Sequence, residues 1–297
     1  MGKAMLSYSG SQYATFCKAV KQNGFPQDTR QGMSSELIME SFSVKPYDYI
    51  PAAESRRFNL GFGFVEAVSL LTGLDNIELF TRHIKSYGQF STDGLRLDNS
   101  YGSRASDSIA KCLEILGSSD TEDARYAVTT INNSSTDLWS KSKHVPCTLS
   151  IQFLSRRGQL HQMVNMRSND VFKGCAYDVF SFGLLHVIMA QNLGLRVGRY
   201  VTTAGSLHCY EYDYNTVDSM TNDSPLLLDF SHEFDIADKV LLGQCLLSED
   251  FSKLPNSWMK DIALASFARW QPELMLQVSE KNLSVLRKAQ RFTNVTK

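Results

Sequence analysis

The chain has 297 residues, of which 43% are hydrophobic and 21% charged, and its formal net charge is -1. This composition is ordinary for a globular protein, and the balanced charge argues against a nucleic-acid partner, because duplex binding recruits an excess of Lys and Arg to the surface that meets phosphates. No run of about 18 apolar residues and no signal peptide is visible, so we expect no membrane association and a cytoplasmic location, in the host cytoplasm if a virus encodes the chain.

The cysteines are scattered, without a CxxC pair or a Cys/His cluster at zinc spacing. We therefore expect no metal site and no disulfide framework. A single cysteine is by default a small buried hydrophobe. The context of Cys147, described below, indicates a different role.

In chain order, the first clear element is a helix over residues 62–71, where apolar side chains recur at helical spacing with Glu66 among them. Residues 118–123 are predicted to form a loop. Residues 147–154 and 160–166 each alternate between apolar and polar side chains around a short turn, which predicts a β-hairpin.

Further along, residues 179–193 are apolar nearly all round, which predicts a buried helix closed by Gly194. Residues 199–212 then predict a strand broken by Gly205.

Two more helices are predicted over residues 257–269 and 272–291. Because no linker is visible, we expect one domain, with a catalytic part over residues 1–250 and a helical C-terminal extension over residues 251–297.

Several motifs stand in a fixed order along the chain. They are Pro146-Cys147, Arg167-Ser168-Asn169-Asp170, Gly174-Cys175-Ala176-Tyr177-Asp178 and Gly205-Ser206-Leu207-His208-Cys209-Tyr210, with weaker matches at Asp28-Thr29-Arg30, Glu66, Tyr101-Gly102 and Asp123-Ala124-Arg125. Over about residues 20 to 215 this set resembles the thymidylate synthases and their relatives, the deoxycytidylate 5-hydroxymethylases. The resemblance implies an α/β (α+β) fold of the thymidylate synthase type, in which a mixed twisted sheet forms a homodimer interface and helices pack on the other face.

The chemistry of such enzymes explains why these residue types are needed. C5 of a pyrimidine becomes nucleophilic once a thiolate adds at C6, and the resemblance implies this role for Cys147. A neighbouring cation should lower the pKa of the thiol, and Arg167 is the natural candidate. Glu66 is the candidate general acid/base, because a carboxylate on an apolar helix face is expensive to bury unless it works or is paired. Tyr101 is implied to join a water network near C5.

The resemblance also implies a clamp for a nucleotide phosphate, since guanidinium groups match phosphate oxygens bidentately. Arg30 would come from an N-terminal loop, and Arg167 and Ser168 from the same subunit. Arg125 would reach the phosphate site of the partner subunit, which predicts a homodimer.

Two further residues, His208 and Tyr210, are implied to hold the sugar 3′-hydroxyl group. The rest of the Arg167 motif is assigned to substrate binding as well: Asn169 and Asp170. Arg56 and Arg57 are interpreted as solvated helix-cap residues and stay outside the predicted site.

Asp178 stands where the thymidylate synthases have asparagine. A carboxyl group accepts from the 4-amino group of cytosine and can share a proton with N3, whereas opposite O4 of uracil it sets acceptor against acceptor. An unmatched buried polar group costs about 1–3 kcal/mol, enough for tenfold discrimination. Asp178 therefore predicts a cytidylate substrate, as in the deoxycytidylate 5-hydroxymethylases.

Two other departures favour a hydroxymethyl product. Thr148 replaces the histidine that usually follows the nucleophile in thymidylate synthases. The chain end, RKAQRFTNVTK, has no counterpart of the tail that excludes water in those enzymes. Without such a lid, an exocyclic methylene at C5 can be captured by water instead of hydride.

The combined prediction is a deoxycytidylate 5-hydroxymethyltransferase, with 5,10-methylenetetrahydrofolate as cosubstrate, no metal, and a covalent adduct between Cys147 and C6. Deoxycytidylate is favoured over cytidylate, although the small Ala176 leaves room for either sugar. Tyr87 is a candidate aromatic residue in the folate cleft. Two alternatives stay open: a C5 methyltransferase acting on dCMP or dUMP, and a catalytically inactive nucleotide-binding relative.

Overall fold

The computed structural model describes residues 5–118 and 124–293. Most of the predicted loop at 118–123, Asp123 of the weak upstream motif, and the last four residues of the chain end lie outside the described residues. In the part that is described, no helix is both long and apolar enough to span a bilayer.

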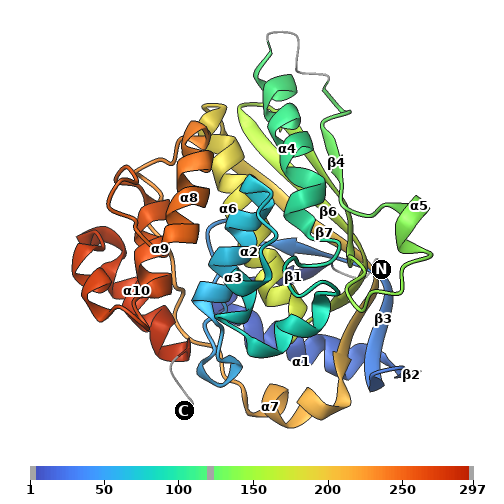
Figure 1. The fold of residues 1–297 in the computed structure, drawn as a ribbon. Coiled ribbons are helices and arrows are strands. Elements are labelled where there is room, and N and C mark those ends of the chain that lie inside the picture. The colour runs from blue at the N-terminus through green and yellow to red at the C-terminus, as the bar shows by residue number, and fades with distance from the viewer. Residues whose placement is uncertain (1–4, 119–123, 294–297) are drawn as a thin grey trace.

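A seven-stranded mixed sheet forms the centre of the fold (Figure 1). Its strands follow the order β1-β3-β7-β6-β5-β4, with β2 paired to β3. The β6/β7 and β1/β3 pairs are parallel and the others antiparallel. The strands are β1 (Leu6–Tyr8), β2 (Phe25–Thr29), β3 (Gly32–Val44), β4 (Val128–Thr130), β5 (Thr148–Arg156), β6 (Gln159–Asp170) and β7 (Arg196–Tyr210).

Helices are stacked on this sheet in successive layers. α6 packs directly on β6 and β7, α2 packs on α6, and α8 and α9 pack on α2. Figure 1 shows α8, α9 and α10 grouped at the side of α2 that lies away from the strands. The helices are α1 (Tyr13–Asn23), α2 (Leu60–Thr72), α3 (Ile77–Thr81), α4 (Tyr101–Gly117), α5 (Ser134–Asp137), α6 (Gly174–Asn192), α7 (Tyr214–Ser219), α8 (Lys239–Ser248), α9 (Trp258–Phe267) and α10 (Glu280–Thr293).

The central helices follow from local sequence signals. Asn59 caps α2 by accepting from the backbone N–H of Phe62, and Gly73 ends the helix in the left-handed region at φ 80°. The predicted helix at 62–71 is therefore confirmed. α6 starts at Gly174, five residues before the predicted start, so Asp178 lies on this helix.

The predicted hairpin is confirmed as β5 and β6, whereas the predicted break at Gly205 is wrong. β7 runs through Gly205 without interruption because the glycine serves close approach and not a turn: a Cβ there would lie 3.0 Å from the carbonyl oxygen of Arg167 on the neighbouring strand. At the C-terminal end, the second predicted helix is interrupted, since residues 272–277 form a short 3-10 helix.

The mixed α/β architecture expected from the sequence is confirmed. On β6, His161, Met163 and Asn165 alternate with core residues and stay partly or fully exposed in the single chain. This face of the sheet is where the predicted homodimer would form, and that pairing stays a prediction.

Candidate active site

A cavity of about 1360 Å³, called here the outer cavity, opens where β6 and β7 end and α6 begins. Strands and helices far apart in the sequence contribute to it, so no single segment of the sequence predicts it. Ten of the twelve predicted site residues line it: Arg30, Tyr101, Cys147, Arg167, Ser168, Asn169, Asp170, Asp178, His208 and Tyr210.

Strand register places the polar groups of the outer cavity in rows. β6 and β7 run parallel with Ser168 opposite Ser206 and Asp170 opposite His208. β3 runs antiparallel to β7 and places Glu36 opposite His208. Because directly opposite side chains on one sheet face lie about 5 Å apart at Cβ, Asp170, His208 and Glu36 form one row across three strands.

Cys147 lies directly before β5, held between Tyr101 and Arg167. The Tyr101 hydroxyl accepts from the backbone N–H of Cys147 at 3.0 Å and of Thr148 at 3.2 Å. Arg167 donates to the carbonyl oxygens of Pro146 at 3.0 Å and Val145 at 2.9 Å. These bonds anchor the segment that carries the thiol to α4 on one side and to β6 on the other.

The expected lowering of the thiol pKa is wrong as a net effect. Burial raises the pKa of Cys147, Arg167 lowers it in part, and the carboxyl groups of Asp178 and Asp170 raise it further. One guanidinium group therefore does not offset the loss of hydration in the protein alone. In the protein alone the net effect on Cys147 therefore favours the thiol over the thiolate.

Two carboxyl groups line the same chamber as the thiol, and burial raises the pKa of both. Burial raises the pKa of Asp178 to about 7, with a further contribution from Asp170. Burial raises the pKa of Glu66 well above its usual range, Asp178 adds to this, and a hydrogen bond from Tyr87 at 3.4 Å opposes it. Carboxyl groups with raised pKa values that share a cavity with a thiol are typical of acid/base sites.

A second chamber of about 520 Å³, the inner chamber, adjoins the outer cavity and shares Tyr101, His144, Cys147 and Asp178 with it. Glu66 lies here, on the wall formed by α2. Aromatic rings make up much of the remaining wall, with centroid separations of 4.8 to 6.3 Å among neighbours: Phe62, Phe80, Tyr87, Phe90 and Tyr177. An apolar, aromatic-lined space of this kind fits a flat heteroaromatic ligand.

Arg56 is buried in the inner chamber wall, so its interpretation as a solvated cap residue is wrong. Its guanidinium group donates to the Tyr13 hydroxyl at 3.2 Å and to the carbonyl oxygen of Lys173 at 2.9 Å. These partners satisfy a buried cation that the sequence could not place, since they lie about 40 and 120 residues away.

His144 is a site residue that the sequence analysis missed. It lines both spaces, packs near Tyr101, Tyr87 and Phe90, and its Nδ1 bonds the carbonyl oxygen of Asp98. Burial lowers its pKa, so the imidazole is neutral at neutral pH. Its position three residues before Cys147 was the available signal.

Arg125 lies apart from both spaces. It is exposed just before β4, where its carbonyl oxygen accepts from Gln152 at 2.8 Å, and it does not line the outer cavity of its own chain. The predicted reach into a partner subunit therefore stays a prediction.

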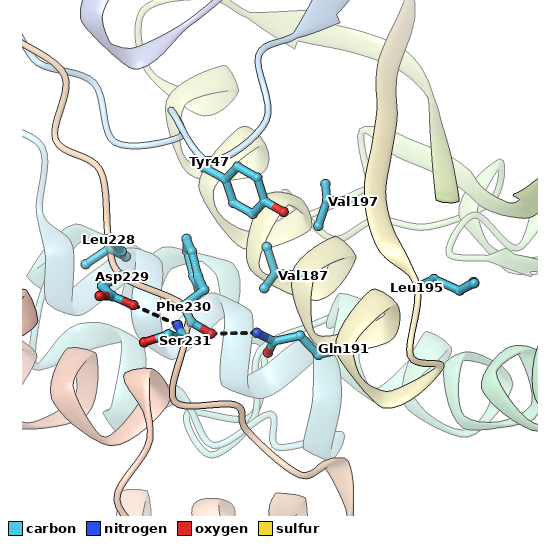
Figure 2. Close-up of a pocket in the computed structure, with 9 residues that line it drawn as sticks. All are labelled: Tyr47, Val187, Gln191, Leu195, Val197, Leu228, Asp229, Phe230 and Ser231. Atoms are coloured by element: carbon cyan, nitrogen blue, oxygen red, sulfur yellow. Dashed lines mark hydrogen bonds between the residues drawn. The ribbon is translucent and has the colours of Figure 1, made fainter. Parts of the chain in front are cut away.

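A separate hollow of about 400 Å³ lies at the opposite end of α6 (Figure 2). Figure 2 shows Tyr47, Val187 and Phe230 around it, with Gln191 bonded to the backbone of Phe230. Its described lining includes one carboxylate, Asp229, and neither a cysteine nor a cation. Among its described lining residues, this hollow therefore has no counterpart of the thiol and the cations near Cys147.

No group of three or more His, Cys, Asp or Glu residues able to hold a metal ion occurs within residues 5–118 and 124–293. The arrangement around Cys147 thus consists of a thiol, carboxyl groups, a neutral imidazole and arginines.

Comparison with known proteins gives one family match and a set of relatives. A family model described as thymidylate synthase matches residues 11–237. The chain is similar to a deoxyuridylate hydroxymethyltransferase of Pseudomonas phage M6, at 28% identity over 205 residues that cover 65% of this chain and 57% of the relative. It is also similar to a protein of the same name from Bacillus phage SP01, at 29% identity over 208 residues covering 61% and 54%. The chain spans a little over half the length of these curated relatives.

Proposed function

Because the chain belongs to the thymidylate synthase family, we propose that it transfers a one-carbon group to C5 of a cytidine monophosphate and releases the product as 5-hydroxymethyl. One observation carries the proposal: Cys147 and Asp178 line both a polar cavity and an aromatic chamber, and Glu66 lines the chamber with them. The outer cavity suits the nucleotide and the inner chamber suits the folate. The hydroxymethyl outcome is supported by the names of the two phage relatives.

Asp178 supports cytosine as the base. Its raised pKa keeps a proton available near neutral pH. A neutral carboxyl group can donate to N3 of cytosine through its O–H and accept from the 4-amino group through its carbonyl oxygen. N3 of cytosine is basic and O4 of uracil is scarcely so, and the shared proton therefore favours cytosine.

The same proton serves the chemistry. As the Cys147 sulfur bonds to C6, the electron pair of the C5–C6 double bond moves toward C4 and N3. Asp178 gives its proton to N3 and, as a carboxylate, takes the proton that leaves the thiol. When methylenetetrahydrofolate is bound, it supplies a one-carbon unit at the oxidation level of formaldehyde. The ionised form of Glu66, through water at Tyr101, then takes the proton that leaves C5, and its raised pKa makes it a stronger base than an ordinary carboxylate. Asp178 and Glu66 both line the inner chamber, as Cys147 does.

His144 is proposed to deliver the water that completes the hydroxymethyl group. A carbonyl oxygen accepts only, so the bond to Asp98 places the imidazole proton on Nδ1 and leaves the lone pair on Nε2. Nε2 can take one proton from water as the oxygen bonds to the exocyclic methylene carbon. The electron pair of the exocyclic double bond moves into the ring, the C5–C6 double bond re-forms, and Cys147 leaves from C6. The proton on N3 returns through Asp178 to the departing sulfur.

The phosphate is proposed to bind at the rim of the outer cavity. Arg30, Arg167 and Ser168 lie there in one chain, together with Lys173. Arg125 of the partner subunit would complete the clamp in a homodimer, which fits its exposure and its absence from the cavity of its own chain.

A second candidate function is hydroxymethylation of deoxyuridylate, which the names of both phage relatives favour. In that case protonated Asp178 would donate to O4 and accept from N3–H of uracil. The two candidates differ in the base and share the machinery around Cys147.

Tritium release from C5-tritiated CMP, dCMP, UMP and dUMP, followed by mass analysis of the products, tests the proposal. Release from a cytidine nucleotide, with a product heavier than the methyl derivative by one oxygen atom, is the expected result. Release from uridine nucleotides alone would overturn the cytosine assignment, and a methyl product would overturn the role of water.

A further inference from the structure

Glu36 places a carboxylate in the wall of the outer cavity, where no step proposed above uses it. It lies on β3 directly opposite His208 on β7. His208 and Tyr210 are the pair proposed to hold the sugar 3′-hydroxyl group, and their rings lie 4.9 Å apart. A hydroxyl group bound by His208 is therefore next to Glu36.

A short hydrogen-bond chain fixes the direction of these groups. Ser206 donates its hydroxyl proton to Oε1 of Glu36 and lies 3.2 Å from Nδ1 of His208. Because the serine proton is already committed to the carboxylate, its oxygen accepts from Nδ1–H of His208. Nε2 of a neutral His208 is thereby left as an acceptor for the 3′-hydroxyl group.

The carboxylate itself keeps one oxygen for a ligand. Ser206 engages Oε1, and Oε2 has no hydrogen-bond partner among the residues that the structure describes. An ionised carboxylate accepts only, so the group that satisfies Oε2 must be a donor. The donor that a pyrimidine nucleotide can offer beside its 3′-hydroxyl group is the neighbouring hydroxyl at C2′.

We propose that Glu36 reads the 2′-hydroxyl group and makes the site selective for a ribonucleotide, cytidylate, over the deoxynucleotide. This inference rests on the proposed function and deepens it. It reverses the deoxycytidylate preference expected from the sequence and separates this chain from its two phage relatives, whose names specify deoxyuridylate. A 2′-deoxy ligand leaves Oε2 facing the sugar without a donor, which is the source of the discrimination.

Calorimetric titration with CMP, dCMP, UMP and dUMP measures the inference without any folate. The wild-type protein is expected to bind CMP about tenfold or more tightly than dCMP, as expected for a hydrogen bond to a charged group. Glu36→Leu should bring the CMP/dCMP affinity ratio close to one. Ser206→Ala keeps the carboxylate but frees it to rotate, so the ratio should fall by a smaller factor.

Two controls separate recognition from a structural role. Glu114→Gln removes an exposed carboxylate on α4 and should leave the ratio at the wild-type value. Arabinocytidine monophosphate, whose 2′-hydroxyl group points to the opposite face of the sugar, should bind like dCMP. If Glu36 only supports Ser206 and His208, Glu36→Leu weakens both nucleotides equally, and the unchanged ratio overturns the proposal.

The four nucleotides distinguish failure of this inference from failure of the proposed function. A preference for uracil over cytosine overturns the base assignment, while the UMP/dUMP ratio still reports on Glu36. Equal or tighter binding of the deoxynucleotides overturns the role of Glu36 and leaves the cytosine assignment standing. Absence of binding by all four overturns both.

Discussion

The outer cavity and the inner chamber meet at Cys147, yet they differ in the charged groups that they hold and in how far those groups are buried. The outer cavity gathers cations and hydrogen-bonding groups from strand ends, with Arg167 bonded to backbone carbonyl oxygens. The inner chamber surrounds Glu66 with aromatic rings, and burial raises the pKa of that carboxyl group. The first arrangement suits recognition of a fixed anion, and the second suits a group that must gain and lose a proton. The thiol at the boundary is influenced by both.

The largest expected effect on activity comes from substitution of Cys147, the residue at which the two spaces meet. Cys147→Ser replaces the thiol by a weaker nucleophile and should reduce tritium release from C5 by at least about a thousandfold, as expected when a covalent step is lost. Nucleotide binding to the outer cavity should persist, because the arginines and Asp178 are unchanged. Calorimetry alongside the release assay checks both parts. Release at more than a tenth of the wild-type rate would contradict the covalent mechanism.

His144→Leu should separate the proton step at C5 from the water step. The apolar leucine keeps the wall packed but removes the nitrogen proposed to take a proton from water, so hydroxymethyl formation should fall by about a hundredfold, within the range of general base catalysis. Tritium release should fall by a smaller factor. The ratio of product formed to tritium released is the measurement, and an unchanged ratio argues against His144.

Asp178→Asn should shift the base preference from cytosine toward uracil. The amide keeps one donor and one acceptor but has no proton to share with N3, so the CMP/UMP preference should change by about tenfold or more. The pH dependence sharpens the test. The wild-type carboxyl group is neutral below its pKa of about 7, so cytidylate binding should weaken as pH rises through 7. The asparagine variant should lack this step.

Arg125 tests whether the phosphate end of the outer cavity is shared between subunits. Arg125→Ala should raise KM for the nucleotide about tenfold through loss of a charge-assisted bond. Mixing the Arg125→Ala protein with the Cys147→Ser protein should restore activity. In a heterodimer, one of the two sites combines Cys147 of the first chain with Arg125 of the second. Random pairing predicts up to about a quarter of wild-type activity in a twofold-symmetric dimer. Absence of restoration in a mixed dimer would place Arg125 outside the site.

The sequence predicted the central elements because their signals are local. The apolar spacing around Glu66 and the alternation on both sides of the turn before Gln159 each survive in the structure. Gly205 was misread because its reason for being glycine is the carbonyl oxygen of Arg167 on another strand. A glycine signals that space is short without saying which neighbour takes it.

Site residues that belong to a sequence motif were predictable. A residue whose neighbours are set by strand pairing was missed. Ten of the twelve predicted residues line the outer cavity. Glu36 escaped notice because its importance arises from pairing with His208, more than 170 residues later. The direction of the pKa shift of Cys147 was predicted wrongly. The sequence shows the cation, Arg167, but not the burial that outweighs its effect.

The smallest expected effect is on stability, and it sharpens the contrast between the chambers. A carboxyl group whose pKa is raised in the folded state favours folding below its unfolded pKa of about 4, and that contribution is lost as pH rises through the folded value. For Asp178 this contribution to folding is lost between about pH 4 and pH 7.

Above about pH 7 the folded protein must hold a buried carboxylate, which lowers its stability. Asp178→Asn and Glu66→Gln remove the buried charge and should stabilise the protein by about 1–3 kcal/mol at pH 8 and by less at pH 5. Glu114→Gln, an exposed carboxylate paired with Lys111, should change stability by about 0.5 kcal/mol or less at both pH values. Urea unfolding at the two pH values measures the difference. Equal effects at pH 5 and pH 8 would show that the inner wall does not disfavour charge, and the acid/base role drawn from it for Glu66 would lose its physical basis.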